Sequence, residues 1–484
     1  MTNGEYQSRR EFIKRSAVTG AGLALGGGTS FGEVKNDGPP FVTCRKDRKL
    51  VGVYCSPYEV MEHPEYIDAL QTKLGCNVIA LNAEGVTYPD DIRRLYPLPP
   101  EVKQSIGPAH VDNDEPIHRC AEILHGRGMD MWLVGSGHAD LGYDDSISPV
   151  DFDGIMFRHH RVPKYAIESA TGLCFQKERI LRWQIHAYPW ICANYDIDAL
   201  YLTHHRYNIP SIYSRLWGCA CEECQAAASR LGYRFSDMRR AMLRLDKALH
   251  SLTRERVTRI AGTGCSFTDF LQTMTDGDDI LSWLEFRSAA FGDAFGRVNR
   301  SVRSLTQGRC RFVIDTVGPT FMPLVGHSMP YYAGQASDAF YAMAWVDYHY
   351  VSVVASWANA LCEWVPGLDE KTALAAVYNF VGWNDIGLPR DQIDDLCIGK
   401  TSAEHSIPEF YKGFGKHLEP LMRHEYDRAA LVNIHDVPSY QTVFPHFWGR
   451  KPAEALIEAI LENGHDGYFF EISAEPFVKQ PERT

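Results

Sequence analysis

Short apolar runs alternate with amphipathic segments along most of this chain. The apolar runs predict strands at 49–55, 77–81, 130–134, 199–202, 310–315, 342–350, 429–434 and 465–471. Helices are expected between them, at 65–74, 116–126, 177–193, 236–252, 280–305, 351–364 and 371–381. Strands that alternate with helices form parallel sheets, and eight of them favour a closed (β/α)8 TIM barrel of the α/β class over an open doubly wound sheet.

The same pattern indicates one large domain at about 45–478. A segment rich in Asp, Ser and Pro at 139–170 predicts a long loop insertion at the C-terminal face of the barrel. The sequence has no run of about 20 apolar residues, so we expect no stable membrane span. It also has no G-x-G-x-x-G turn and no Walker motif, which leaves a nucleotide-binding fold without support.

Residues 1–36 are expected to be a signal peptide and leader. The stretch SRREFIK at 8–14 resembles the twin-arginine export motif, and a weakly apolar Gly- and Ala-rich stretch follows at 17–28. A basic region followed by such a stretch is typical of an export signal. We therefore expect the twin-arginine translocation machinery to carry the folded protein to the periplasm or the exterior.

The charge balance narrows the range of partners. The net charge is −12, and residues 1–32 hold four basic and two acidic side chains, so the remainder of the chain is near −14. An acidic chain without basic clusters argues against nucleic acid and anionic membranes as partners. The 57 aromatic residues (23 Phe, 24 Tyr and 10 Trp) suit a sugar-binding cleft, but they also suit an ordinary core.

Four cysteines predict a metal site. Cys219, Cys221 and Cys224 form a C-x-C-x2-C run, and Cys174 precedes the helix expected at 177–193. Four thiolates suit tetrahedral Zn²⁺, and a disulfide with two free thiols is the alternative. Either arrangement is structural, because four protein ligands leave zinc no open position for a substrate.

The segments around these cysteines carry a family resemblance. They read GLCFQKER at 172–179, DIDALYL at 196–202, HHRY at 204–207 and GCACEEC at 218–224. This order of cysteine, helix, strand and C-x-C-x2-C loop resembles the region of the fourth strand in bacterial glycoside-hydrolase-like (β/α)8 barrels. The resemblance is distantly to family 42 β-galactosidases, whose similar cysteine cluster binds structural zinc, and it implies structural zinc here.

The resemblance extends over roughly 50–350 and includes WLEFR at 283–287 at the start of a long helix. Trp283 and Arg287 lie four residues apart on one helix face, which predicts packing of that helix on the barrel. The chain departs from the family at Thr203, where the fourth strand often ends in Asp.

In such a barrel the chemistry belongs at the C-terminal ends of the strands. Glycosidic cleavage uses two carboxyl groups, one as acid and one as nucleophile or base. Asp315 and Glu471 each close an apolar strand and form the best catalytic pair, since apolar walls can raise the pKa of one of them. The remaining polar strand-end residues are expected to bind the sugar: Tyr54, Asn82, Glu84, His138, His204, His205, Arg206, Tyr207, Asp347 and His435.

These features predict an exported glycoside hydrolase that acts on a poly- or oligosaccharide. One alternative is a metal-dependent sugar isomerase, epimerase or hydrolase with His138, His204, Asp315 and Glu471 as ligands. Another is a non-catalytic carbohydrate-binding barrel, which Thr203 favours. If Asp315 and Glu471 lie too far apart across the mouth of the barrel to act on one bond, the binding barrel is favoured.

Overall fold

The computed structural model describes residues 49–82, 86–96, 113–135, 146–160, 162–166, 174–207, 218–274, 277–342, 346–401, 404 and 406–481. The predicted leader lies outside these residues, as do two predicted site residues, Glu84 and His138. No described helix combines the length and the apolar character that crossing a membrane requires.

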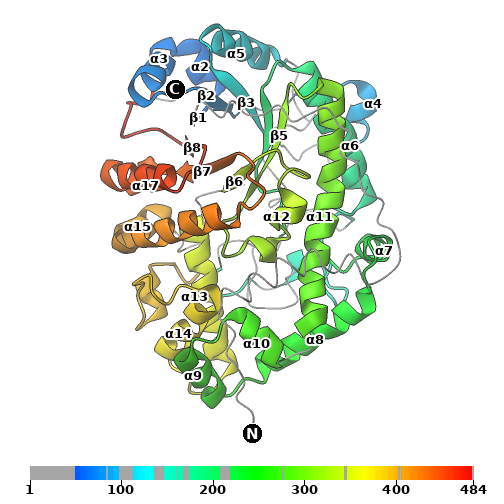
Figure 1. The fold of residues 1–484 in the computed structure, drawn as a ribbon, viewed down its shortest axis with the longest axis vertical. Helices are drawn as coiled ribbons and strands as arrows, with labels where there is room; N and C mark the ends of the chain where they lie inside the picture. The colour runs from blue at the N-terminus through cyan, green and yellow to red at the C-terminus, as the bar shows by residue number, and fades with distance from the viewer. Residues whose placement is uncertain are drawn as a thin grey trace. The chain divides into compact units, whose positions relative to one another are not determined.

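Eight parallel strands close into a barrel in the order of the sequence, which confirms the predicted (β/α)8 fold (Figure 1). Each strand pairs in parallel with the next, and β8 returns to β1 through pairs such as Leu50 with Gly467. The strands are β1 (Leu50–Cys55), β2 (Val78–Leu81), β3 (Asp130–Gly135), β4 (Ala199–Leu202), β5 (Arg311–Thr316), β6 (Phe340–Ala342), β7 (Ser439–Val443) and β8 (Gly467–Phe470).

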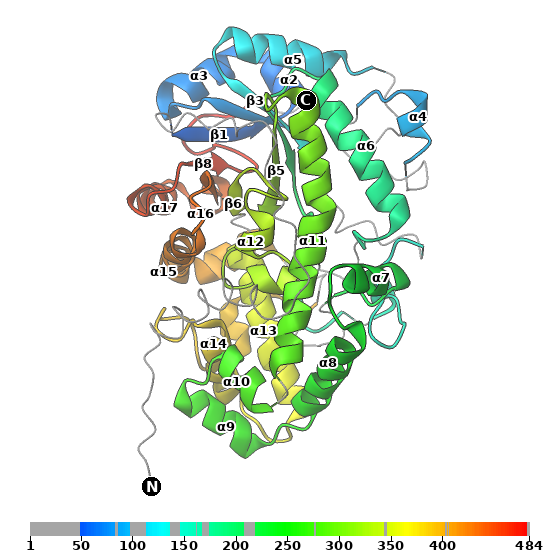
Figure 2. The same cartoon turned by 45° about the vertical axis from the view of Figure 1, so that its right-hand side comes forward.

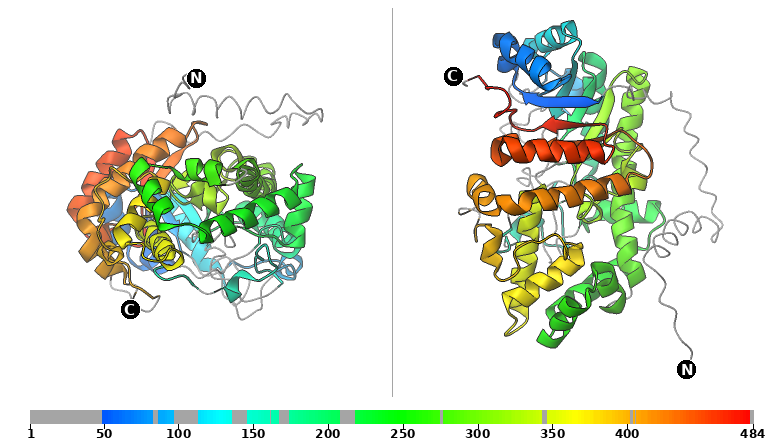
Figure 3. Two further views of the ribbon diagram at one scale, coloured as in Figure 1. Left: turned by 90° about the horizontal axis from the view of Figure 1, so that it is seen from below. Right: turned by 60° about the vertical axis from the view of Figure 1, so that its left-hand side comes forward.

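Helices connect successive strands and pack around the barrel, as two further views show (Figure 2, Figure 3). The helices are α2 (Pro57–Glu62), α3 (Pro64–Leu74), α4 (Asp90–Arg93), α5 (Glu115–Gly126), α6 (Glu178–Asn194), α7 (Glu222–Arg230), α8 (Phe235–His250), α9 (Arg254–Thr263), α10 (Phe267–Met274), α11 (Gly277–Thr306), α12 (Met329–Tyr332), α13 (Val346–Trp364), α14 (Glu370–Val381), α15 (Ile407–Val432), α16 (Pro445–Trp448) and α17 (Arg450–Glu462).

Aromatic side chains fill the inside of the barrel. Trp132 of β3 lies against Phe469 of β8 with ring centroids 4.7 Å apart, and Tyr440 of β7 packs on the same indole. Gly52 of β1 makes room for this layer, because a Cβ there would lie 2.1 Å from the Phe469 ring. The interior is therefore a packed core with no room for a ligand at this level.

A second group of helices lies beyond the C-terminal ends of the strands. Helix α11 has 30 residues, about 45 Å of helix, whereas the six-residue strand β5 spans about 20 Å. Because α11 ends just before β5, its N-terminal half extends past the mouth of the barrel. There it meets α8 and α10, while α14 packs on α9 and α13 (Figure 2).

The described part of the predicted insertion, 146–160 and 162–166, also lies on this side. Ala220 N–H donates to Val150 O over 2.8 Å, and Tyr165 Oη donates to Asp394 Oδ1 over 2.7 Å. The segment thus connects the cysteine loop with the 3-10 helix Ile393–Leu396.

Two predicted strands are wrong. The run at 342–350 is not strand six, because β6 ends at Ala342 and α13 begins at Val346. The run at 429–434 is not strand seven but includes the end of α15, where the apolar Leu431 and Ile434 are exposed. The true β7 reads SYQTV and buries its polar side chains, so no apolar run marks it. The other six strands lie within two residues of their predicted ends.

Candidate functional site

Asp315 and Glu471 occupy inward-facing positions at the mouth of the barrel. Val313 of β5 and Phe469 of β8 belong to the cluster inside the barrel. Side chains alternate along a strand, so residues two positions later face the same interior. Asp315 and Glu471 are 2% and 7% exposed, respectively, which places both carboxyl groups in a water-poor setting.

Three tyrosines, called here the tyrosine floor, lie beside these carboxyl groups, and Tyr341 is the register partner of Asp315. Tyr54 of β1, Tyr201 of β4 and Tyr341 of β6 meet at one level, with 4.5 Å between the ring centroids of Tyr201 and Tyr341. The charges of both Asp315 and Glu471 act on the phenols of Tyr201 and Tyr341. The structure therefore brings the two predicted catalytic residues to one aromatic floor.

These phenols keep their protons. Burial raises the pKa of Tyr201 and Tyr341 well above its usual value, and the nearby carboxylates raise it further. Tyr54 is affected in the same way by burial, by Tyr341 and by Glu471, so its pKa is also raised. At neutral pH the floor thus presents O–H donors to any oxygen that lies above it.

The loop after β4 fixes Asp315. The backbone N–H of His204 donates to Oδ1 and Oδ2 of Asp315 over 3.0 and 3.1 Å. His204 holds a left-handed backbone with φ 59°, which is uncommon for a residue with a side chain. Such strain is concentrated at functional sites, where the surrounding structure enforces it.

A buried histidine connects the end of β5 to the same loop. His327 places Nδ1 2.8 Å from Thr316 Oγ1 and Nε2 3.1 Å from His205 O. Burial lowers the pKa of His327 to about 3, so the ring is neutral and serves as a rigid connection. Tyr332 adds a hydrogen bond from its hydroxyl to Ile314 O in β5.

Of the four predicted binding residues at 204–207, some lie at the site and others pack around it. His204 is partly exposed beside Asp315, whereas His205 is buried, with Nδ1 2.9 Å from Thr203 O and Nε2 3.0 Å from Tyr188 Oη. Tyr207 is buried and lies edge-on to Phe175. Arg206 is buried as well, and its positive charge acts on Tyr350.

The structure does not bring every predicted binding residue to the mouth. Tyr54 lies in the tyrosine floor, and Asn82 is exposed directly after β2. Asp347 belongs to the first turn of α13, and its side chain is not among those described. His435 lies in the turn before β7, so it is at the opposite end of the barrel from the mouth, because 429–434 is not a strand.

Three residues of this site are not found when candidates are taken only from the ends of predicted strands. Tyr201 and Tyr341 lie within β4 and β6, where an aromatic residue looks like ordinary core, and His327 lies far from any strand in sequence. The available signal is the alternation along β4, which places Tyr201 on the same face as Thr203.

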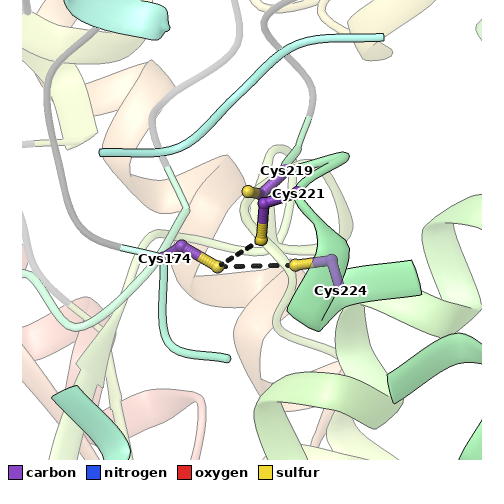
Figure 4. Close-up of side chains that lie close together, drawn as sticks. All are labelled: Cys174, Cys219, Cys221 and Cys224. Atoms are coloured by element: carbon purple, nitrogen blue, oxygen red, sulfur yellow. Dashed lines mark hydrogen bonds between the residues drawn. The ribbon is translucent and has the colours of Figure 1, made fainter. Parts of the chain in front are cut away.

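The four cysteines converge beside this end of the barrel (Figure 4). Cys174 Sγ lies 3.6 Å from Cys221 Sγ and 3.4 Å from Cys224 Sγ, and all four sulfurs lie within 4.8 Å of one another. A tetrahedron of sulfurs about 2.3 Å from zinc has edges of about 3.8 Å. All four thiols are free and buried, so the described cysteines form no disulfide, and this group could hold a metal ion.

Local hydrogen bonds suit negatively charged sulfurs. Val150 N–H donates to Cys219 Sγ over 3.4 Å, and Cys221 and Cys224 lie at the N-terminal end of α7, where the helix dipole favours anions. Hydrogen bonding within the group lowers the pKa of the Cys221 thiol. The cluster also pins the inserted segment, because Cys174 N–H donates to Ile147 O over 3.0 Å.

Comparison with known proteins finds similar solved structures at low sequence identity. No family model matches the sequence, and no curated protein matches it. The chain is similar to a solved β-galactosidase from the Antarctic haloarchaeon Halorubrum lacusprofundi, at 12% identity and a TM-score of 0.38, over 87% of this chain and 52% of that one. It therefore spans about half the length of that enzyme.

Two further solved structures are similar to the chain. They are α-L-fucosidase isoenzyme 2 from Paenibacillus thiaminolyticus (10% identity, TM-score 0.32, 88% of this chain and 65% of that one) and β-glucosidase 1317 (10%, 0.32, 85% and 77%). All three bear the names of glycoside hydrolases. Because their TM-scores lie below 0.5, the likeness does not define an activity for this chain, and the fold rests on its own closed order of strands.

Proposed function

We propose that this protein is a glycoside hydrolase that cleaves a poly- or oligosaccharide with Asp315 and Glu471. One observation carries the proposal: two buried carboxyl groups face the barrel interior at its mouth and act on the same two tyrosines. Glycosidic cleavage needs such a pair, one protonated and one ionised, beside the scissile bond.

The surroundings support a different role for each carboxyl group. Asp315 accepts the His204 N–H on both of its oxygens, and hydrogen bonds to a carboxylate favour the charged form. Asp315 is therefore the nucleophile, or the base that activates water. Glu471 is buried beside three tyrosines, and as the second carboxyl group of the pair it is the acid that donates to the leaving oxygen.

The test is hydrolysis of a panel of aryl glycosides and glycans by the wild-type chain and by Asp315→Asn and Glu471→Gln. We expect each variant to lose a factor on the order of 10³ or more in kcat. Asp466→Asn is the matched control, since Asp466 also flanks β8 but accepts Ser439 N–H at the opposite end of the barrel. Wild-type activity in either mouth variant would refute the proposal.

If the wild-type chain cleaves nothing on the panel yet is retained on a glycan column, the carbohydrate-binding alternative replaces the hydrolase. A metal-dependent reaction would require activity that returns only with added Zn²⁺ or Mn²⁺. His138, one of the ligands which that alternative needs, lies outside the described residues.

The proposal includes export through the twin-arginine machinery. Support comes from the SRREFIK stretch at 8–14 and the Gly- and Ala-rich stretch that follows it at 17–28. Replacing Arg9 and Arg10 together by Lys should leave the protein in the cytoplasm of an expressing bacterium, whereas Lys14→Gln serves as the control and should be exported. Periplasmic recovery of the double variant would refute this route.

We also propose that Zn²⁺ occupies the four-cysteine group. Cys174, Cys219, Cys221 and Cys224 would hold it, and the ion would supply a crosslink between loops and no catalytic position. Metal analysis of the purified protein should find one zinc per chain, and Cys174→Ser should lower that content. A full complement of zinc in the serine variant would place the ion elsewhere.

A further inference from the structure

Arg287 of α11 is a buried cation with an incomplete set of partners. Its side chain is 0% exposed, and Nη1 donates to Leu324 O over 2.8 Å. Nε and Nη2 have no hydrogen-bond partner among the described residues, and Arg287 takes part in no described ion pair. An uncompensated buried charge is strongly destabilising, so the position calls for an anionic partner.

The cysteine loop lies directly against these donors. A Cβ built on Gly218 would lie 2.4 Å from the Trp283 ring and 3.0 Å from Arg287 Nε, so only glycine lets the loop approach this part of α11 so closely. The next residue along the loop is Cys219. The charges of Cys219 and Cys224 both act on the guanidinium.

The other face of the guanidinium is already occupied. It lies 4.5 Å from the centroid of the Tyr207 ring, a cation–π contact that holds the plane of the group in place. The guanidinium therefore lies in contact with the Tyr207 ring and close to the cysteine loop, whose thiolates are the negative charges that act on it.

A second cation, Lys177, also lies near the cluster. The charges of Cys221 and Cys174 act on Lys177, whose Nζ lies 2.9 Å from Glu223 Oε2. Lys177 is shared with that surface carboxylate, so Arg287 is the buried cation committed to the sulfurs.

We infer that Arg287 is the counter-charge of the metal-loaded cluster and acts through its positive charge on the thiolates of Cys219 and Cys224. The inference rests on the proposed metal site. A divalent ion with four thiolates carries a net charge of about −2, which one buried guanidinium partly offsets. Arg287 is thus a positioning residue, and metal binding and the burial of Arg287 stabilise each other.

The test measures zinc affinity by chelator competition for wild type, Arg287→Met and Arg287→Lys. Loss of an outer-shell partner typically weakens metal binding 10–100-fold, and we expect about that loss for Arg287→Met. Arg287→Lys keeps the charge without the fork of donors and should lie between the two. Cobalt loading adds a spectroscopic readout, because the thiolate-to-cobalt absorption should shift when the positive charge beside the thiolates is removed.

Thermal unfolding with and without zinc separates this role from packing. Arg287→Met should lower the midpoint temperature of unfolding more in the zinc-loaded protein than in the chelator-treated protein. Arg303→Met, on the same helix but paired with Asp338, is the matched control and should lower both midpoints equally.

Equal losses with and without zinc for Arg287→Met, at unchanged zinc affinity, would overturn the counter-charge role and leave the metal site standing. A wild-type chain that binds neither zinc nor cobalt would overturn both the metal site and the role of Arg287.

Discussion

At the scale of single residues, the site depends on groups that burial keeps in one protonation state. His205 and His327 hold the loop after β4 against the end of β5, and burial lowers the pKa of each to about 3. Both rings keep both nitrogens within hydrogen-bonding distance of neighbouring groups, and their burial disfavours the charged form.

This predicts a stability that falls in mild acid. In the unfolded chain a histidine titrates near pH 6.5, whereas the folded rings titrate near 3, so between these values the unfolded state binds more protons and is favoured as pH falls. At pH 5 each ring should cost about 2 kcal/mol of unfolding free energy. Urea unfolding at a series of pH values from 7.5 to 5 measures this cost. In His327→Asn the unfolding free energy should depend less steeply on pH. An unchanged slope in that variant would contradict the account.

A second residue-scale prediction concerns the packed interior. Gly52→Ala places a methyl group where the Phe469 ring lies, which should cost about 1–3 kcal/mol of unfolding free energy. Gly415→Ala, in the interior of α15 with open space around it, should instead stabilise the protein by about 0.5–1 kcal/mol. Chemical denaturation distinguishes the two, and equal effects would contradict the packing described for the barrel.

At the scale of elements, the sequence predicts six strands well because their apolar runs are buried on both faces. The apolar pattern does not predict β6 and β7, because β6 has only three residues and β7 buries serine, glutamine and threonine. The same errors misplaced His435 and Asp347, whereas Asp315 and Glu471 follow strands that the pattern does mark. Arg287 looked like a packing residue, and its two unpaired donors become visible only in three dimensions.

The loop after β4 gives an element-scale prediction. His204→Gly keeps the N–H that Asp315 accepts and relieves the left-handed backbone, so unfolding free energy should stay level or rise by up to about 1 kcal/mol. His204→Val should destabilise the protein instead, because a β-branched residue resists φ 59°. A glycine variant less stable than the valine variant would contradict a left-handed backbone at this position.

At the scale of the whole molecule, the cysteine group connects parts of the chain that are far apart in sequence. It joins the inserted segment at 146–150, the start of the segment leading to α6, the start of α7 and, through Arg287, the long helix α11. Removing the metal should therefore loosen the mouth of the barrel more than its strands. Hydrogen exchange after chelation should rise at 146–150 and 218–224 and stay low in β1–β5; a uniform rise would contradict a local crosslink.

The central claim is that Asp315 and Glu471 act together on a glycosidic bond. The most direct measurement is the kcat of wild type, Asp315→Asn, Glu471→Gln and the double variant on the best substrate of the glycoside panel. Residues that act as one unit are not additive, so we expect each single variant to lose a factor on the order of 10³ or more and the double variant to lose little beyond that. Losses that multiply in the double variant, or a single variant that keeps its activity, would contradict the account.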